Sequence, residues 1–322
     1  METLTVILII LGFFMVSTCI AMISVIAGIG GGVIFTPIML AFTNVNSLVV
    51  RATGIIVAMF SSPISIGVFI KKGLVNFRLS LIMAISQSFG ALFGATMAVR
   101  AATEAGVVGE GFLRLSLGII LFLLVIYFLS GGKKLEWPVV KHVDNLTSIL
   151  KLDHRFYEES EGVVHDYKVK RAALGIFLIF LIGIIGGFFG MGGGWAIAPV
   201  LNMGMGMPLK LAAVNSGFIL GLSGGVSVWP FVFAGGIIPL FVLPWLAGQI
   251  VGGFVGAHLL ARVKASVVRV ILIGIMFYTS FTLLSRGFEM IGAIGRIPAI
   301  VDVLVFASTM IGVCFIIVRR KV

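Results

Sequence analysis

The sequence predicts an all-α polytopic membrane protein made of two inverted repeats, and three observations lead to this fold class. Of its 322 residues, 60% are hydrophobic and only 11% are charged, with a mean hydropathy of +1.21. The apolar residues form runs of about 20 residues, the length that a helix needs to cross a hydrocarbon core of ~30 Å. A glycine-rich stretch also occurs twice, at an offset of 162 residues.

Nine apolar runs are long enough to span a bilayer, and we expect each of them to be helical. They cover 4–27, 48–70, 77–99, 111–130, 172–190, 209–233, 237–261, 266–285 and 298–318. Shorter apolar pieces follow the two glycine-rich stretches, at 33–42 and 195–203. The first run lacks a basic segment before it and is too long for a signal peptide, so we expect it in the mature protein.

The duplication defines the predicted organisation of the chain. The stretch at 28–37 reads GIGGGVIFTP and the stretch at 190–199 reads GMGGGWAIAP, with five of ten positions identical. The sequence around Gln87 matches that around Gln249 at the same offset of 162. Internal duplication of this kind is typical of secondary transporters. The predicted parts are a first transmembrane repeat at 1–130, a charged cytoplasmic linker at 131–171, a second repeat at 172–285, and an extra C-terminal helix with a basic tail at 286–322.

The distribution of Lys and Arg favours a topology in which each glycine stretch turns its segment back. If all nine runs cross the membrane, the basic residues divide 13 to 10 between the two sides, without a clear bias. If 4–42 and 172–203 are re-entrant hairpins and the N-terminus lies outside, 18 of 23 lie inside, together with the linker and the C-terminus. This satisfies the positive-inside rule. Each half then has three full crossings, so the repeats are inverted, and the two hairpin tips are expected to meet near the middle of the membrane.

The duplicated glycines are candidate substrate-binding residues because a helix broken inside a membrane must line a protein or water cavity. Glycine lets a ligand approach the backbone, while Pro37 and Pro199 lack a backbone donor and disfavour helical geometry in Thr36 and Ala198. A helix that starts just after the glycines would direct N–H groups and its positive dipole end at a cavity, which favours an anion. The alternative is close helix packing, which we expect at the later glycines of each repeat. These are Gly90, Gly94, Gly252 and Gly256.

Few polar residues lie within the apolar runs. Gln87 and Gln249 occupy equivalent positions, and a buried amide is costly unless it is paired, so each lines a cavity or bonds between helices. Thr53, Asn215 and Ser216 follow the two hairpins and either donate to an anion or serve packing.

Three arginines lie near the predicted ends of helices. Arg51 is either a mouth residue that attracts anions or an interfacial anchor, whereas Arg114 and Arg269 are repeat mates that we expect to be interfacial anchors.

The charged residues exclude several functional classes. None of the twelve Asp and Glu residues lies deep in the duplicated runs, which disfavours a cation carrier and favours an anionic or neutral substrate. The basic residues lie in short loops, which are topology signals and do not indicate nucleic-acid binding. The linker histidines, His142, His154 and His165, have no metal-ligand spacing, and Leu146, Ile149, Leu150 and Phe156 suggest a short amphipathic helix in an otherwise solvated linker. No catalytic motif lies within an apolar run, so we expect neither an enzyme nor a cofactor.

Two hydrophobic halves, each with Gly-x-Gly-Gly-Gly and a proline five residues after the last glycine, resemble the TauE/SafE sulfite exporter family. The resemblance covers both repeats. It implies a transporter of sulfite, sulfonates or related organosulfur anions in a bacterial-type inner membrane, and leaves the oligomeric state open, a homo-oligomer included. The residues that carry it are Gly28, Gly30, Gly31, Gly32, Pro37, Gly190, Gly192, Gly193, Gly194 and Pro199.

We therefore expect a secondary carrier, in the export direction, of small sulfur-containing anions. Another small organic anion, a neutral solute, or a non-transporting membrane scaffold remain the alternatives. The predicted substrate-binding set is Gly28, Gly30, Gly31, Gly32, Pro37, Thr53, Gln87, Gly190, Gly192, Gly193, Gly194, Pro199, Asn215, Ser216 and Gln249.

Overall fold

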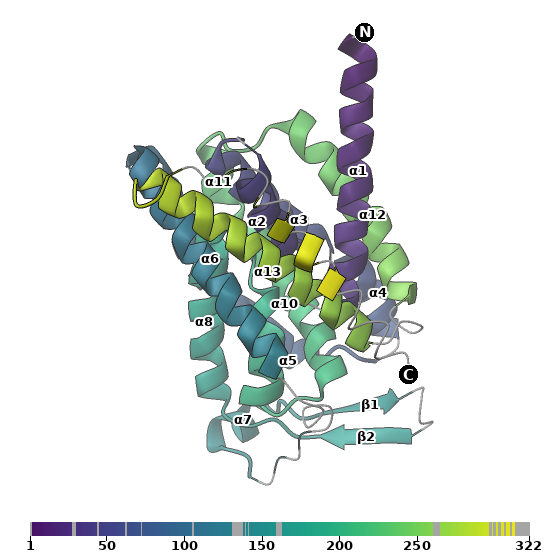
Figure 1. Ribbon diagram of the computed structural model, residues 1–322. Helices are drawn as coiled ribbons and strands as arrows, with labels where there is room; N and C mark the ends of the chain where they lie inside the picture. The colour runs from purple at the N-terminus through teal and green to yellow at the C-terminus, as the bar shows by residue number, and fades with distance from the viewer. Residues whose placement is uncertain are drawn as a thin grey trace.

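The protein is an all-α polytopic membrane protein, as its sequence predicts (Figure 1). Five helices in the described part are long and apolar enough to cross a membrane, namely Ile7–Val25, Phe77–Ala102, Ala172–Phe189, Leu211–Phe233 and Pro239–Gly256. The computed structural model describes residues 2–27, 30–43, 45–61, 63–71, 73–104, 106–130, 138, 140, 142–158, 163–259, 265–295, 298, 301, 304–305, 307–309 and 311–312. Most of the predicted last run, 298–318, lies outside these residues.

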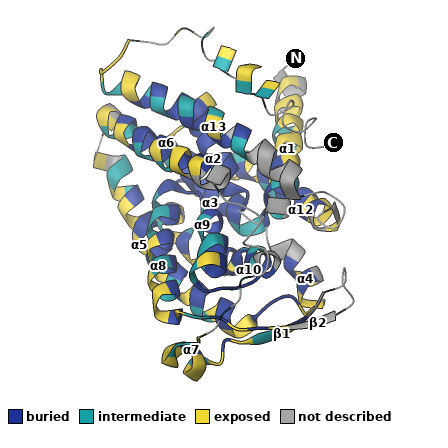
Figure 2. Ribbon diagram, turned by 60° about the horizontal axis from the view of Figure 1, so that its bottom comes forward, coloured by how far each residue is buried: buried dark blue, intermediate teal, exposed yellow. Residues whose placement is uncertain are grey.

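The two halves contain corresponding series of helices. The first half consists of α1 (Glu2–Ala27), α2 (Gly32–Phe42), α3 (Ser47–Ser61), α4 (Pro63–Lys71), α5 (Phe77–Glu104) and α6 (Gly106–Ser130). The second consists of α8 (Ala172–Phe189), α9 (Gly194–Pro199), the π-helical turn η2 (Val200–Gly204), α10 (Leu209–Ser227), α11 (Trp229–Phe233), α12 (Pro239–Leu259) and α13 (Ala265–Met290). The central elements α2, α3 and α10 are mostly buried, whereas much of α1 is exposed (Figure 2).

The chain reverses direction at the first glycine stretch, because α1 and α2 pass the same residues of α12 in opposite order. Along α1, Phe13 stacks on Trp245 and Ser17, one turn later, accepts a hydrogen bond from Gln249. After the break, Gly31 lies against Gln249 and Phe35, one turn later, packs edge-on against Trp245. The segment 4–42 is therefore a broken-helix hairpin.

The second glycine stretch makes the corresponding turn beside α5. A Cβ on Gly183 of α8 would lie 2.5 Å from the Gln87 carbonyl oxygen, and one on Gly193 would lie 2.2 Å from the Gln87 side-chain nitrogen. The chain thus passes Gln87 before the break and returns to it afterwards.

The long helices of one half pack on those of the other through glycine, as the sequence predicts for these positions. A Cβ on Gly90 would lie 2.1 Å from the Phe180 carbonyl oxygen, and one on Gly252 would lie 2.2 Å from that of Thr18. Gly90 and Gly252 are 162 residues apart, and so are their partners, Thr18 and Phe180. Equivalent contacts follow one turn later for Gly94, Ile184, Gly256 and Met22. The α5–α8 and α1–α12 contacts are therefore built alike.

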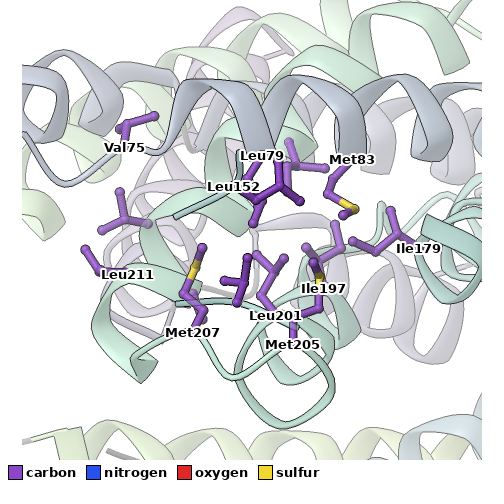
Figure 3. Packing of buried hydrophobic residues seen from close by; sticks show 14 of the residues in the cluster. Val75, Leu79, Met83, Leu152, Ile179, Ile197, Leu201, Met205, Met207 and Leu211 are labelled. Atoms are coloured by element: carbon purple, nitrogen blue, oxygen red, sulfur yellow. The ribbon is translucent and has the colours of Figure 1, made fainter. Parts of the chain in front are cut away.

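The linker contains the predicted short helix, with Leu146, Ile149 and Leu150 in it, but the rest of the linker is not simply solvated. It contains the helix α7 (Asn145–Leu150) and an antiparallel hairpin of β1 (His154–Glu158) and β2 (Val163–Tyr167). Phe156 belongs to β1 and is buried, so its assignment to an amphipathic helix is wrong. Leu152 belongs to a hydrophobic cluster with α5, α8, α9, η2 and α10 (Figure 3). This apolar contact holds the linker against the helical part of the chain.

Candidate functional site

The two glycine stretches turn the chain at the same repeat position. Gly30 and Gly192, which are repeat mates, have φ values of +79° and +69°, a region that glycine adopts without steric cost. The following helices begin at Gly32 and at Gly194, also repeat mates. Helices that start just after the glycines are therefore confirmed, and their first N–H groups have no partner within their own helix. Gly28 lies outside the described residues.

The two stretches lie directly against each other. The Thr36 hydroxyl donates a hydrogen bond of 2.7 Å to the Gly190 carbonyl oxygen. A Cβ on Gly32 would lie 2.6 Å from the Gly54 carbonyl oxygen and 2.7 Å from that of Met191. Because backbone atoms occupy the space that a side chain would need, close packing accounts for the glycine at position 32 in this conformation.

Each half places one glutamine on the glycine stretch of the other half. A Cβ on Gly193 would lie 2.2 Å from Nε2 of Gln87, and one on Gly31 would lie 2.6 Å from Oε1 of Gln249. Gln249 also donates to the Ser17 hydroxyl at 2.9 Å, so its amide bonds between helices as well. The structure therefore brings the two glutamines and both glycine stretches into one site.

The glutamine oxygens are the polar atoms of this site with unused bonding capacity. Oε1 of Gln87 and Oε1 of Gln249 are buried and have no hydrogen-bond partner within the described part of the chain. Leaving a buried acceptor unpaired costs about 1–3 kcal/mol, so a ligand that bonds to it recovers that free energy. Rotation of an amide by half a turn would present N–H donors to the same space.

Two tryptophans near the site were not among the predicted residues. Nε1 of Trp195 and Nε1 of Trp245 are buried donors without a partner among the described residues. Trp195 follows the first residue of α9, Trp245 lies one turn before Gln249 on α12, and both belong to one hydrophobic cluster with Phe35. An indole N–H can only donate, which suits an anion. One feature of the sequence could have identified Trp195. It departs from the duplication, because Val33 occupies the equivalent position in the first stretch.

Three other predicted site residues have partners within the fold. The hydroxyls of Thr53 and Ser216 donate to carbonyl oxygens of their own helices, each at 2.8 Å. The Asn215 side-chain oxygen accepts from the Asn76 backbone N–H at 2.8 Å and from the Ser80 hydroxyl at 2.7 Å. Asn215 thus ties α10 to the start of α5.

The two prolines lie inside helices. Pro37 is within α2 and Pro199 ends α9, so the expectation of non-helical geometry at Thr36 and Ala198 is wrong. Tertiary contacts, such as the bond from Thr36 to Gly190, hold the first helix in shape. The second helix widens into a π-helical turn from Val200, an adjustment found where a proline removes an i→i−4 bond.

The arginines near the ends of the helices are buried. Arg51 has 0% exposure and lines a cavity of about 320 Å³, so an interfacial anchor is excluded for it. Arg114 is also buried and donates to the Leu40 carbonyl oxygen at 2.6 Å, so its assignment as an interfacial anchor is wrong. A cation at the C-terminal end of α2 complements the negative end of the helix dipole. The side chain of Arg269 lies outside the described set.

Metal binding finds no support in the described residues, where no group of three or more His, Cys, Asp or Glu side chains could hold an ion.

Comparison with known proteins gives one family. The family model described as Sulfite exporter TauE/SafE matches residues 13–283. The chain is 24% identical over 252 residues to a Bacillus subtilis (strain 168) protein named Probable membrane transporter protein YunE, covering 76% of this chain and 86% of that protein. It is 28% identical over 128 residues to Sulfite exporter TauE/SafE family protein 6 of Arabidopsis thaliana, covering 39% of this chain and 29% of that protein. No solved structure matches the chain.

Proposed function

Because the chain belongs to the TauE/SafE sulfite exporter family, we propose that it is a secondary transporter that exports small sulfur-containing anions such as sulfite or organosulfonates. It works by alternating access around the two glycine breaks. The observation that carries the proposal is the reciprocal contact of Gln87 with Gly193 and of Gln249 with Gly31. A site made of two equivalent parts, one from each half, suits a carrier that opens to either side of the membrane.

The location of two equivalent connections supports an inverted relation between the halves. The connection between α2 and α3 lies beside the start of α6, because Ser47 bonds to Glu110 and Arg114 bonds to Leu40. The connection between η2 and α10 lies beside the linker, because the Lys170 N–H donates to the Met205 carbonyl oxygen.

The helix α5 separates these two places. It begins next to Asn76, which bonds to Leu152 of the linker, and its 28 residues extend about 42 Å to the corner with α6. A hydrocarbon core is ~30 Å thick, so equivalent connections at the two ends of α5 would face opposite sides of a membrane. With the linker and its side of the membrane in the cytoplasm, 18 of the 23 Lys and Arg residues lie inside, so the positive-inside rule favours this orientation, with the N-terminus outside, in a bacterial-type inner membrane.

The chemistry of the site favours an anion. The unpaired N–H groups of Trp195 and Trp245 are hydrogen-bond donors near the glycine breaks, and the helix that starts at Gly32 places its positive dipole end there. A carrier of another small organic anion or of a neutral solute would use the same scaffold, and a scaffold protein without transport would show no substrate-dependent flux.

The test is flux in proteoliposomes with sulfite, sulfoacetate, a carboxylate of similar size and an organic cation. Gly193→Ala introduces a Cβ against the flexible end of Gln87, which disturbs the site and leaves the backbone in place. Gly225→Ala is the matched control, because a Cβ there meets nothing within 4 Å. We expect saturable flux of the sulfur anions that falls at least tenfold in Gly193→Ala and is unchanged in Gly225→Ala. Flux of the carboxylate alone would refute the proposal that the substrate is a sulfur-containing anion. Equal flux in both variants would refute the proposal that the glycine breaks form the transport site.

A further inference from the structure

A cavity lies at the corner between α5 and α6, and two of its lining residues, Arg51 and Phe188, adjoin the second glycine break. Its volume is about 320 Å³, roughly ten times the ~30 Å³ that one water molecule occupies in the liquid. Arg51, Glu110, Phe112, Ser116 and Phe188 are among the residues that line it. A small oxyanion with part of its hydration shell fits this space, and the wall includes a cation.

The guanidinium of Arg51 is buried with unused donors. Its Nε donates to the Ser47 carbonyl oxygen at 3.3 Å, and its terminal nitrogens donate to the Ser47 hydroxyl at 3.1 Å and to the Phe188 carbonyl oxygen at 3.4 Å. A guanidinium has five N–H groups, so two of them have no partner among the described residues. Two adjacent N–H groups of a guanidinium match two oxygens of an oxyanion.

Glu110 attracts Arg51 electrostatically, although the two side chains are joined only through Ser47. The Ser47 hydroxyl donates to a Glu110 carboxylate oxygen while it accepts from Arg51, so Ser47 bridges the two charges. Glu110 also attracts Arg114, and Arg286 lies close enough to repel that residue. The carboxylate is partly exposed, whereas both Arg51 and Arg114 are buried. The cluster therefore has more positive than negative charge around the cavity, which is a favourable setting for an anion.

Arg51 also connects the cavity to the second glycine stretch. Its Nη1 bonds to Phe188, in the last turn of α8, two residues before Gly190. A Cβ on Gly190 would lie 2.4 Å from the Cα of Arg51, so α3 and the break are in backbone contact. The bond to Phe188 is long, at 3.4 Å, and a ligand that draws the guanidinium toward the cavity would weaken it first.

We infer that this cavity is a second anion-binding site, in which a sulfur oxyanion displaces the Glu110 carboxylate from Ser47 and binds the two remaining N–H groups of Arg51. Glu110 is then an internal competitor that keeps Arg51 neutralised while the site is empty. Occupation of the site weakens the hydrogen bond from Arg51 to Phe188, and the weakened bond couples anion binding to the break at Gly190. The inference places an entry or exit subsite on the proposed transport path and in that respect rests on the proposed function, but binding to the site can be measured without transport.

The experiment measures equilibrium binding of radiolabelled sulfite to purified, detergent-solubilised full-length protein, with flux in proteoliposomes measured in parallel. Arg51→Gln removes the cation that binds the anion. It is expected to weaken sulfite binding by about tenfold to hundredfold, as for the loss of a charged hydrogen-bond partner. Glu110→Gln removes the internal competitor and is expected to tighten binding by about threefold to tenfold. Arg100→Gln is the matched control, because it removes the same charge from an exposed position on α5.

A gain of affinity in Glu110→Gln cannot result from misfolding, so the inference stays testable even if Arg51→Gln folds poorly. Weaker binding in Glu110→Gln, or the same binding in Arg51→Gln as in Arg100→Gln, would overturn it. Arg51-dependent binding without flux in the wild-type protein would support the site and refute the transport proposal. Sulfite flux whose half-saturating concentration does not change in Arg51→Gln would refute the site and leave the transport proposal in place.

Discussion

The two halves of this protein share their helix breaks and helix-packing glycines and differ in several polar side chains. Equivalent glycines turn the chain, pack helix against helix and receive a glutamine from the opposite half. In contrast, Val214 is equivalent to Arg51 when Thr53-Gly54 is aligned with Ser216-Gly217, and Ile179 is equivalent to Ser17. Duplication has thus preserved the glycines and glutamines of the two breaks, whereas Arg51, buried in the first half, has no arginine at the equivalent position of the second half.

The largest effect is expected where the backbones of the two halves touch. A Cβ on Gly54 would lie 2.0 Å from the Thr36 hydroxyl and 2.2 Å from the Gly190 carbonyl oxygen. Gly54→Ala should therefore destabilise the protein by about 3 kcal/mol or more, because backbone has to move. Thermal unfolding in detergent measures this, with Gly225→Ala as the control that unfolds like the wild type. A Gly54 variant of unchanged stability would contradict the observed contact.

The next effect tests whether the halves are functionally equivalent. Gln87→Leu and Gln249→Leu each remove one amide from the glycine stretch of the other half. If both amides contact the substrate, sulfite flux should fall about tenfold in each variant, the loss of one or two hydrogen bonds. Measured flux that falls in one variant alone would show that the halves have different roles.

Ser17 gives a smaller and one-sided effect. It accepts from Gln249 and donates to the Trp245 carbonyl oxygen, whereas Ile179 offers no such bond in the second half. Ser17→Ala should lower flux about threefold by loosening the Gln249 amide, and should add nothing when combined with Gln249→Leu. Additive losses in the double variant would mean that Ser17 acts independently of Gln249.

The smallest effect concerns the linker. Burial raises the pKa of the Tyr167 hydroxyl to about 12, although the hydrogen bond from Asn76 lowers it and the charge of Asp153 raises it further. In the unfolded chain a tyrosine has a pKa of about 10, so the neutral form favours the folded state. This contribution is present below about pH 10 and is lost as the pH rises toward about 12. The melting temperature should fall more steeply over that window in the wild type than in Tyr167→Phe, and parallel curves would contradict it.

The repeat explains which features could be predicted. Because a position and its mate 162 residues away had to play the same role, the sequence alone located the helix breaks, the packing glycines and the paired glutamines. Burial of an arginine depends on which helices surround it in the fold. The position of a single arginine near the end of a helix does not indicate these neighbours. The role of Arg51 was therefore left open between two alternatives, and Arg114 was wrongly predicted to be an interfacial anchor.

The linker and the indoles eluded prediction for a related reason. The strands β1 and β2 have only five residues each, which is too short a pattern to distinguish a strand from one turn of helix. Phe156 of β1 and Tyr167 of β2 are buried because they belong to a hydrophobic cluster with residues of α5 and α10, far away in sequence. The unpaired N–H groups of Trp195 and Trp245 likewise result from the apolar neighbours that tertiary packing places around them.

The most direct test of the account is the sidedness of two equivalent connections. Single cysteines would replace Asn46, between α2 and α3, and the exposed Met203, at the end of the second hairpin, in a chain without Cys19 and Cys314. A membrane-impermeant thiol reagent applied to intact cells and to inverted vesicles then reports which face each cysteine occupies. The account predicts that position 46 reacts from outside and position 203 from the cytoplasm. Labelling of both positions from the same face would show that the repeats are not inverted and would contradict alternating access between them.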